Sequence, residues 1–557
     1  MDNNTIANDF SMLAKLMEIH GENSFKIKSY SNAAFVIEKL PVELSTLPEE
    51  KIFSIKGIGD AIGKKIINQL ETGSLKLLDE FLLKTPAGIL EMLCIKGIGP
   101  KKIATIWKDL DIENIGELLY ACNENRLLLF KGFGAKTQQN IKEAIEFFQK
   151  NMGSYQYASI EPYALAFHKK LQDTFPGFLC MPAGIFRRNM PIIDQLEWVV
   201  TIPEDELTDF FTENGYRIVL HTDSGIHFKG EENVLLIFYF SNKDNFYATL
   251  FRHSCSAVFL NAWLKKFSLK EIFPDEESIF SKEGIAYIPP FLRETETILQ
   301  NAIDGQLPIP LETTDVKAVI HSHSKWSDGM NSIEEMAVAA KEKGYEYLVI
   351  SDHSKSAFYA NGLDEKRIMA QHEEIDALNK KFFPFKIFKS IESDILNDGR
   401  LDYPDHVLQT FDLVIASVHS NLKMTEEKAM ARLLAAIENP YTTILGHMTG
   451  RLLLSRQGYP VNHEIFIEAC AKHQVVVELN AHPKRLDIDW EWLPYCLQQN
   501  VLISIDPDAH SITGFDDIRY GVLAAQKGGL TKDQNLSSFS LASFELFLKA
   551  QQAKRKC

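Results

Sequence analysis

Cysteine is scarce in this sequence and forms no recognisable metal or disulfide motif. The 557 residues include seven cysteines, and no two of them make a Cys-x-x-Cys pair. Without such pairs a cysteine zinc site is not expected, and scattered cysteines argue against a disulfide framework. A reducing compartment, the cytoplasm, is therefore the predicted location.

Long apolar runs are missing as well. No stretch approaches the roughly 18 consecutive apolar residues that a membrane span needs. The first residues are polar and acidic, whereas a secretory signal begins with basic residues followed by an apolar run. We therefore expect a protein that is neither exported nor inserted in a membrane.

An excess of basic residues is also absent. The formal net charge is −16, which as a single value argues against a nucleic-acid partner. The charge is uneven, however, because residues 1–150 hold 19 basic and 20 acidic residues, against 40 and 55 in the remainder. The first quarter is nearly neutral, and a chain of this length predicts roughly three or four domains.

A glycine motif occurs three times in residues 1–150. Residues 55–59 and 95–99 both read Ile-Lys-Gly-Ile-Gly, and residues 130–134 read Phe-Lys-Gly-Phe-Gly. Amphipathic helical patterns flank the copies, so we expect tight turns between helices. Glycine permits close backbone approach, and the amides that begin the second helix can hold a phosphate.

A tight helical turn is the alternative use of a single copy, but three lysine-flanked copies favour sequence-independent binding of the DNA backbone. The predicted DNA-binding residues are Gly57, Gly59, Lys64, Lys65, Gly97, Gly99, Lys101, Lys102, Gly132 and Gly134. The expected partner is gapped DNA or a single-stranded DNA end. We expect the protein to bind it as a monomer, in the cytoplasm at the nucleoid.

Residues 21–34, Gly-Glu-Asn-Ser-Phe-Lys-Ile-Lys-Ser-Tyr-Ser-Asn-Ala-Ala, resemble the opening of family X DNA polymerases. The resemblance implies that Lys65 falls where lyase-competent members keep a Schiff-base lysine. A plain phosphate contact is the favoured alternative for this side chain.

Residues 183–200 resemble the nucleotide-binding segment of that family, with departures. Gly184, Arg187 and Arg188 match a Gly-Ser-x-Arg-Arg motif, but the aspartate pair that holds magnesium falls on Gln195 and Glu197. A neutral amide is a poor magnesium ligand, and a glutamate is one methylene too long for a strict octahedral site. The resemblance thus implies a degenerate palm and thumb over residues 151–300, with doubtful magnesium binding.

The segment 234–240, where the third carboxylate belongs, contains no acid. A loop shift that brought Asp194 or Asp223 into the site would restore a working polymerase, and this alternative stays open. Residues 287–294 resemble the end of the thumb, and the proline-containing residues 301–316 predict a linker.

From residue 317 onward, short apolar runs alternate with helical patterns, which predicts parallel strands joined by helices. Each of seven runs is followed by a side chain of a metal-ligand type, beginning with His321 and His323. Positions i and i+2 of a strand share a face, so these two imidazoles are expected to reach one ion. In barrels the carboxyl ends of the strands form one face, where such ligands converge.

These segments resemble the PHP (polymerase and histidinol phosphatase) family along residues 317–557. The resemblance implies a distorted (βα)7 barrel that binds three divalent metals, zinc or manganese with iron as a further option. One metal would be held by His321, His323, Glu392 and Asp508; a second by Asp328, His353 and His510; a third by Glu392, His419 and His447.

The expected catalytic residues are Glu392, His419, Asp508 and His510. Bound metals acidify water and stabilise both the attacking and the leaving oxygen of a phosphoester. Arg451 either clamps a substrate phosphate or forms a surface ion pair.

The predicted fold is multidomain: a helical hairpin region, an α+β polymerase-like centre and an α/β barrel. The whole chain resembles bacterial family X DNA polymerases with a C-terminal PHP domain. This implies a metal-dependent phosphoesterase, a 3′→5′ exonuclease or 3′-end-processing enzyme of DNA repair that has lost polymerisation. The alternatives are an active family X polymerase in gap repair, a phosphatase of small esters such as histidinol phosphate, and a non-enzymatic repair scaffold.

Overall fold

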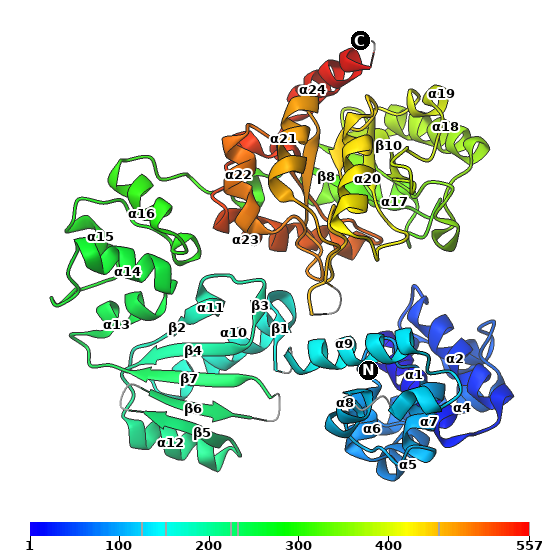
Figure 1. Cartoon of the computed structure of the whole chain (residues 1–557), viewed down its shortest axis with the longest axis horizontal. Coiled ribbons are helices and arrows are strands. Elements are labelled where there is room, and N and C mark those ends of the chain that lie inside the picture. Colours follow the sequence, from blue (N-terminus) through cyan, green and yellow to red (C-terminus); the bar gives the residue numbers. More distant parts are fainter. Residues whose placement is uncertain (124–125, 151–152, 223–224, 231–232, 455–456, 556–557) are drawn as a thin grey trace. The chain divides into compact units, whose positions relative to one another are not determined.

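The computed structural model describes the chain except residues 124–125, 151–152, 223–224, 231–232, 455–456 and 556–557. The chain divides into two compact units, Met1–Met152 and Gly153–Cys557 (Figure 1). Among the helices described, none combines the length and the apolar character that crossing a membrane requires.

The first unit is helical throughout its described part. Helix α1 begins where the Asp2 side chain accepts a hydrogen bond from the Thr5 amide, and it ends at Gly21 in the left-handed conformation. Its apolar side is fully buried, with Phe10 packed against the ring of Tyr30 at 5.8 Å. The helices are α1 (Asn3–His20), α2 (Ser24–Glu38), α3 (Glu49–Phe53), α4 (Asp60–Thr72), α5 (Lys76–Lys84), α6 (Ala87–Met92), α7 (Pro100–Lys108), α8 (Ile115–Asn123) and α9 (Ala135–Lys150).

The three glycine motifs lie in turns between helical segments, as predicted. The first joins α3 to α4, the second joins α6 to α7, and the third joins a 3₁₀ segment (Arg126–Leu129) to α9. Gly57, Gly97 and Gly132 have φ values of 100°, 90° and 96°. Only glycine adopts this conformation readily, so the first glycine of each motif is required by the turn.

The second unit begins with a five-stranded sheet in the order β2-β4-β7-β6-β5 (Figure 1). Strand β4 is antiparallel to β2 and parallel to β7. Helices α10 (Tyr157–Thr174) and α12 (Glu204–Glu213) pack their apolar residues onto this sheet. The strands are β2 (Cys180–Ala183), β4 (Gln195–Val200), β5 (Arg217–Thr222), β6 (Gly225–Lys229) and β7 (Leu235–Phe240). A short helix, α11 (Gly184–Arg187), follows β2, and a small two-stranded sheet pairs β1 (Tyr155–Gln156) with β3 (Ile192–Ile193).

Four helices with a separate apolar core follow the sheet: α13 (Phe246–His253), α14 (Ala257–Lys266), α15 (Glu277–Ser281) and α16 (Glu296–Ile303). The linker predicted over 301–316 is wrong for its first residues, because α16 continues through Ile303. Thr295 caps this helix, and Leu299 and Ala302 are buried in the core. A 3₁₀ turn (Thr313–Asp315) occupies part of the remaining connection.

The rest of the chain forms the predicted seven-stranded parallel barrel. Neighbouring strands pair in sequence order from β8 to β14, and a bridge between Ser322 and Ala509 brings the first and last strands together. The strands are β8 (Ala318–Ser322), β9 (Tyr347–Ile350), β10 (Lys386–Asp394), β11 (Leu413–Ser417), β12 (Ile444–Leu445), β13 (Val476–Asn480) and β14 (Ile503–Asp506).

Helices surround this barrel and one of them closes its amino end. Phe544 of α24 lies 4.6 Å from the ring of Tyr347 and 5.0 Å from that of Phe388, so it fills the space beneath the strands. The helices are α17 (Ile333–Glu342), α18 (Glu365–Phe382), α19 (Asp405–Leu408), α20 (Glu426–Glu438), α21 (His463–His473), α22 (Leu493–Gln498), α23 (Ile518–Lys527) and α24 (Leu541–Lys554).

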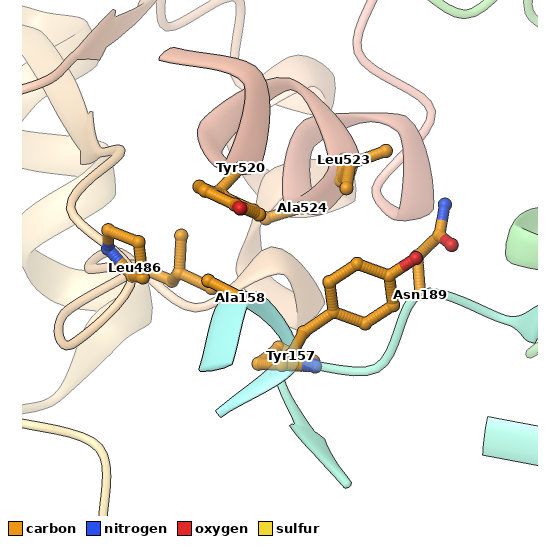
Figure 2. A pocket seen from close by; sticks show the side chains of 9 residues that line it. Tyr157, Ala158, Asn189, Leu486, Tyr520, Leu523 and Ala524 are labelled. Carbon is orange, nitrogen blue, oxygen red and sulfur yellow. The ribbon is translucent and has the colours of Figure 1, made fainter. Parts of the chain in front are cut away.

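Within the second unit, the polymerase-like part packs directly on the barrel. Figure 2 shows Tyr157 and Asn189 facing Leu486, Tyr520 and Ala524 around a cavity of about 10 Å³. This volume is at the lower limit for a single water molecule, so the junction is packed and holds no ligand. Lys527 of α23 reinforces it, because its ammonium group donates hydrogen bonds to Glu294 at 2.6 Å and to the Arg188 carbonyl at 2.8 Å.

The buried guanidinium of Arg293 generates a stability prediction. Its Nη1 lies 2.7 Å from Glu276, and Arg187 pairs with the same carboxylate at 2.7 Å. Burial alone would raise the pKa of Glu276, but the two arginines lower it to about 2. Glu276→Gln should therefore cost about 3–5 kcal/mol at pH 7, because it leaves a buried positive charge without its partner.

Urea unfolding followed by tryptophan fluorescence measures this loss, with exposed Glu277→Gln as the matched control. Because the folded pKa is depressed, the contribution is fully present above the ordinary glutamate value and fades as pH falls toward 2. An unchanged midpoint at pH 7 would contradict the assigned role of Glu276.

Candidate functional site

All nine predicted metal ligands lie together at the carboxyl ends of the barrel strands. His321 lies in β8, one residue before its end, Glu392 lies in β10, and the others occupy the loops that follow strands. Their donor atoms form four groups, each with all atoms within 4.8 Å of one another. The groups are His323, Asp328, His353 and His510; His321, His323 and Asp508; His321, Glu392 and His447; and His353, Glu392 and His419.

Glu392 is the centre of this cluster. Its Oε1 lies 3.3 Å from His321 Nε2, 3.1 Å from His419 Nε2 and 2.9 Å from His447 Nε2. Its Oε2 lies 2.9 Å from His353 Nδ1 and 3.7 Å from His323 Nε2. One fully buried carboxylate therefore lies within 4 Å of five imidazoles.

The observed groups share more residues than the three sets that the resemblance implied, in which Glu392 alone belonged to two sets. His323 reaches Asp328, His353 and His510 as well as His321 and Asp508, and His447 shares a group with His321. The expected sets thus overlap and form one continuous cluster.

The reason expected for the His321–His323 pairing is wrong. His321 has a φ of 59°, and the register of β8 shifts between Val319 and Ser322, so the two residues do not share a strand face. Their rings lie 5.3 Å apart because the chain turns and pairs with Ala509, which accepts from the His323 amide at 2.8 Å. Such a backbone conformation costs about 1–3 kcal/mol and is typical of active sites.

Two further carboxylates orient the imidazoles from outside the cluster. Glu478 Oε2 lies 2.6 Å from His321 Nδ1, and its Oε1 accepts from the His447 amide at 3.0 Å. Asp394 contacts Nδ1 of His419. Holding Nδ1 in this way points Nε2 toward the metal position, as in many metal sites. In the sequence Asp394 and Glu478 are ligand-type residues that follow short apolar runs, and their orienting role was missed.

The charges of the site are strongly coupled. Burial alone would raise the pKa of Glu392, but His419, His321 and His353 hold it well below its usual range. Burial alone would lower the pKa of His419, but Glu392 and Asp394 raise it to about 10. His323 behaves oppositely, because burial and the neighbouring His510 and His353 lower its pKa to about 3, which leaves a neutral imidazole.

These residues fit divalent metals. The donors are imidazole nitrogens and carboxylate oxygens alone, which suits zinc, manganese or iron. Each group offers three or four donor atoms within a few ångströms, and a metal cation can take the place of the proton that Glu392 and Asp394 favour on His419. The cluster is therefore suited to several metals that share ligands.

Two arginines lie near the cluster. Arg451, the predicted phosphate clamp, forms an ion pair with Asp489. It also donates hydrogen bonds to the carbonyls of Arg485, at 3.0 Å, and of Leu486. These contacts match the alternative prediction of an ion pair. The sequence did not single out Arg485, whose Nε lies 3.6 Å from Asp508 Oδ2. Its position shortly after the end of β13 was the available signal.

The hairpin residues have the features of a phosphate site. Gly59 and Gly99 have ordinary φ values of −82° and −84°, and no side chain caps the described helices α4 and α7 that they begin. A Cβ built on either glycine meets no described atom within 4 Å. Neither conformation nor packing therefore requires glycine there, whereas close approach of a ligand to the backbone does.

The lysines of the hairpins differ in exposure. Lys64 and Lys101 are exposed, and Lys65 and Lys102 are half-buried. Lys65 lines a cavity of about 720 Å³ together with Lys26, Tyr30 and Gly57. Gly132 and Gly134 of the third hairpin are exposed, and built Cβ atoms meet nothing within 4 Å in the described part of the chain.

The polymerase-like site lacks carboxylates on the facing strand. Gln195 and Glu197 of β4 pair with Leu235 and Ile237 of β7, a strand without an acid. Glu197 is buried and accepts hydrogen bonds from the Ile185 amide at 3.1 Å and the Tyr239 hydroxyl at 3.0 Å.

The other residues that match the polymerase motif also contact neighbouring side chains. A Cβ on Gly184 would lie 1.4 Å from Glu197 Oε2, so only glycine fits there. Arg187 pairs with Glu276, and Arg188 pairs with Glu294 at 3.0 Å. Asp194 is exposed, and Asp223 lies outside the described residues.

Comparison with known proteins agrees with this architecture. A model described as a helix-hairpin-helix domain matches residues 1–75, a SAM-like helix-hairpin-helix tandem matches residues 89–146, and a PHP domain matches residues 320–482. The chain is 32% identical over 96% of its length to "DNA polymerase/3'-5' exonuclease PolX" of Bacillus subtilis, of which the match covers 97%. The chain belongs to the PolX family. The family and fold predicted from the sequence are thereby confirmed.

Two probable phosphatases also match part of this PolX-family chain. A "Probable phosphatase" of Caldicellulosiruptor bescii is 27% identical over 194 residues, 32% of this chain and 73% of that protein. A probable phosphatase of Caldanaerobacter subterraneus is 28% identical over 165 residues, 29% of this chain and 60% of that protein. These two matches cover 32% and 29% of this chain, far less than the match to the Bacillus protein.

The central position of Glu392 predicts how metal is lost. Glu392→Gln should remove more than one metal per chain, because this carboxylate belongs to two of the donor groups. Elemental analysis after dialysis against manganese measures the content, and Glu373→Gln on the exposed side of α18 is the control. A full complement in Glu392→Gln would show that the carboxylate bridges nothing.

Proposed function

We propose that this PolX-family chain hydrolyses DNA phosphodiesters at its barrel cluster, as a 3′→5′ exonuclease or 3′-end-trimming enzyme. The observation that carries the proposal is the cluster of nine ligand-type residues that has Glu392 near its centre. The name of the Bacillus relative includes a 3′-5′ exonuclease, which supports the direction of attack. Its place would be the repair of gapped or single-stranded ends.

The residues of the cluster have separable tasks. Bound divalent metals supply acidified water and stabilise the charge that develops on the phosphate oxygens. Glu392 and Asp508 hold the imidazoles and bring negative charge to the metal positions. Glu478 and Asp394 keep His321 and His419 in one orientation. Arg485, beside Asp508, is placed to pair with a substrate phosphate.

The hairpins favour DNA over a small phosphomonoester. Three copies of an amide-rich turn, with exposed lysines beside them, provide repeated contacts for a phosphate backbone and none for a single small ester. The shorter matches to probable phosphatases are the reason to keep the small-molecule alternative.

We further propose that template-directed extension is lost. Two-metal catalysis needs carboxylates that bridge the ions, and the palm offers Gln195, Glu197 and an apolar β7. Burial raises the pKa of Glu197, and this carboxylate already binds Ile185 and Tyr239. Arg187 and Arg188, which would contact a nucleotide, are held by Glu276 and Glu294. The charged side chains of the palm thus stabilise the fold through their ion pairs.

Substitutions of the predicted metal ligands distinguish activity at the barrel cluster from activity at the polymerase-like site. His321→Ala with His323→Ala should lower manganese-dependent release of nucleotides from a labelled oligonucleotide more than about 100-fold, since losing even an outer partner costs up to that much. Glu197→Gln should change this rate little. Thermal melting shows whether the variants fold. Incorporation of a labelled dNTP by the wild type, lost in Glu197→Gln, would instead establish a working polymerase.

The hairpins predict binding that depends steeply on salt. Lys64→Ala with Lys101→Ala should weaken binding to a gapped duplex equally for all sequences. It should also reduce the slope of log K against log salt by about two, one for each phosphate contact. Fluorescence anisotropy between low and moderate salt gives the slope. Lys532→Ala with Lys549→Ala removes two exposed charges from the barrel part as a control. Equal slopes in both double variants would exclude the hairpins as the DNA site.

A further inference from the structure

A fully buried carboxylate beside the cluster belongs to none of the four donor groups. This residue is Asp352, which follows β9. Its Oδ1 accepts from the Ser324 amide at 2.8 Å, from the Ser327 amide at 3.2 Å and from the Ser327 hydroxyl. Its Oδ2 accepts from the Ser324 hydroxyl at 2.7 Å and from the side-chain amide of Gln371 at 2.6 Å. We call these four residues the Asp352 network.

The Asp352 network is adjacent in the chain to three of the four ligands of one donor group. The members of that group are His323, Asp328, His353 and His510. Ser324 directly follows the first of these ligands, Ser327 directly precedes the second, and Asp352 directly precedes the third. The fourth is tied to the same loop, because its carbonyl accepts from the Met330 amide at 2.8 Å. One carboxylate thus joins the segments that supply this group.

Asp328 is the ligand of this group that depends most on support from its loop. It lies in the loop after β8, and its side chain is 34% exposed, whereas that of His353 is 7% exposed. Its Oδ1 lies 3.6 Å from His353 Nε2, and its Oδ2 lies 3.5 Å from His510 Nε2. Because metal–ligand distances hold to about 0.2 Å, a small movement of the loop would remove Asp328 from the group.

The hydrogen bonds of Asp352 are directed at that loop. A buried carboxylate is unfavourable unless donors surround it, and four of its five hydrogen bonds come from the two serines of the loop. Removal of the carboxylate would leave the buried Ser324 amide without its acceptor, which is costly. The Asp352 carbonyl accepts from the Glu392 amide at 3.1 Å, and a side-chain substitution preserves this bond.

We propose that Asp352 is the positioning residue that holds Asp328 in its metal-binding position. The carboxylate acts through hydrogen bonds to Ser324 and Ser327, which fix the loop between two ligands. Outer partners of metal ligands typically contribute about 10- to 100-fold to metal affinity. The inference deepens the proposed function and rests on it for the metal cluster, but its test measures metal binding and not cleavage of DNA.

The first test measures how the full-length protein binds manganese. Asp352→Ala should weaken the binding of one metal about 10- to 100-fold and leave the other affinities unchanged. Titration followed by the electron paramagnetic resonance signal of the free ion measures each affinity. Asp412→Ala is the control, because its carboxylate accepts from the Lys389 amide at 2.9 Å just before β11, at the amino end of the barrel. Wild-type affinities in Asp352→Ala would overturn the proposal.

A double variant identifies the metal that is affected. Because Asp352 acts through Asp328, the two substitutions should not add. Asp352→Ala combined with Asp328→Ala should therefore bind manganese as Asp328→Ala does alone. A double variant that retains fewer metals than Asp328→Ala would show that Asp352 acts on another group, and it would overturn the positioning role.

Asp352→Asn separates hydrogen bonding from charge. Asparagine keeps one oxygen for the serine amides, and its NH₂ group can donate to the Ser324 hydroxyl. It can also donate to Gln371 Oε1, which has no hydrogen-bond partner among the residues described. Asp352→Asn should therefore bind manganese as the wild type does. A loss as large as that of Asp352→Ala would make the role one of charge and contradict positioning by hydrogen bonds.

A milder variant tests the proposal even if Asp352→Ala does not fold, which thermal melting of the metal-free protein shows. Ser324→Ala with Ser327→Ala removes two hydroxyl donors, keeps both amides and should weaken the same metal. Unchanged affinities in this pair would overturn the proposal. Manganese binding by the wild type without hydrolysis of DNA would refute the proposed function and leave the role of Asp352 intact. A wild type that binds no manganese would refute both.

Discussion

The attraction between one buried carboxylate and five imidazoles determines the arrangement at the mouth of the barrel. Glu392 is fully buried, and an isolated charge in that position would be very unfavourable. The five histidines that approach it within 4 Å come from or follow four different strands, β8, β9, β11 and β12. The barrel must therefore close accurately enough to bring these strands within one coordination distance of each other. Closure through Ala509 and the outer carboxylates Glu478 and Asp394 both serve this requirement.

Much of the fold and the residues that form the cluster could be predicted from the sequence, because buried parallel strands are short apolar runs and ligand-type side chains lie at or just after their ends. The nine predicted ligands gather at one face for this reason. What could not be predicted depends on distant parts of the chain. The left-handed conformation of His321 arises from pairing with Ala509, and the role of Glu478 depends on strand order. The continuation of α16 into the expected linker follows from burial of Ala302, which sequence periodicity over so few residues does not reveal.

The two polar sites of the second unit use charge in opposite ways. In the barrel, carboxylates and imidazoles face one another around positions that suit metal ions. In the palm, the arginines and acids neutralise one another in pairs, and Glu197 is occupied by a backbone amide and a tyrosine. The packed junction and Lys527 join these parts. The paired charges of the palm thus contribute to the stability of the unit that also contains the barrel.

The closure of the barrel by Phe544 has a consequence for how substrate enters the site and how product leaves it. A channel open at both ends lets a polymer thread through, whereas this barrel is blocked beneath its strands by α24. For a nuclease of the kind proposed, each released nucleotide has to depart through the same opening by which the strand arrived. The shortened strand must move back before its next phosphate can bind, so substrate entry and product release compete for the same opening.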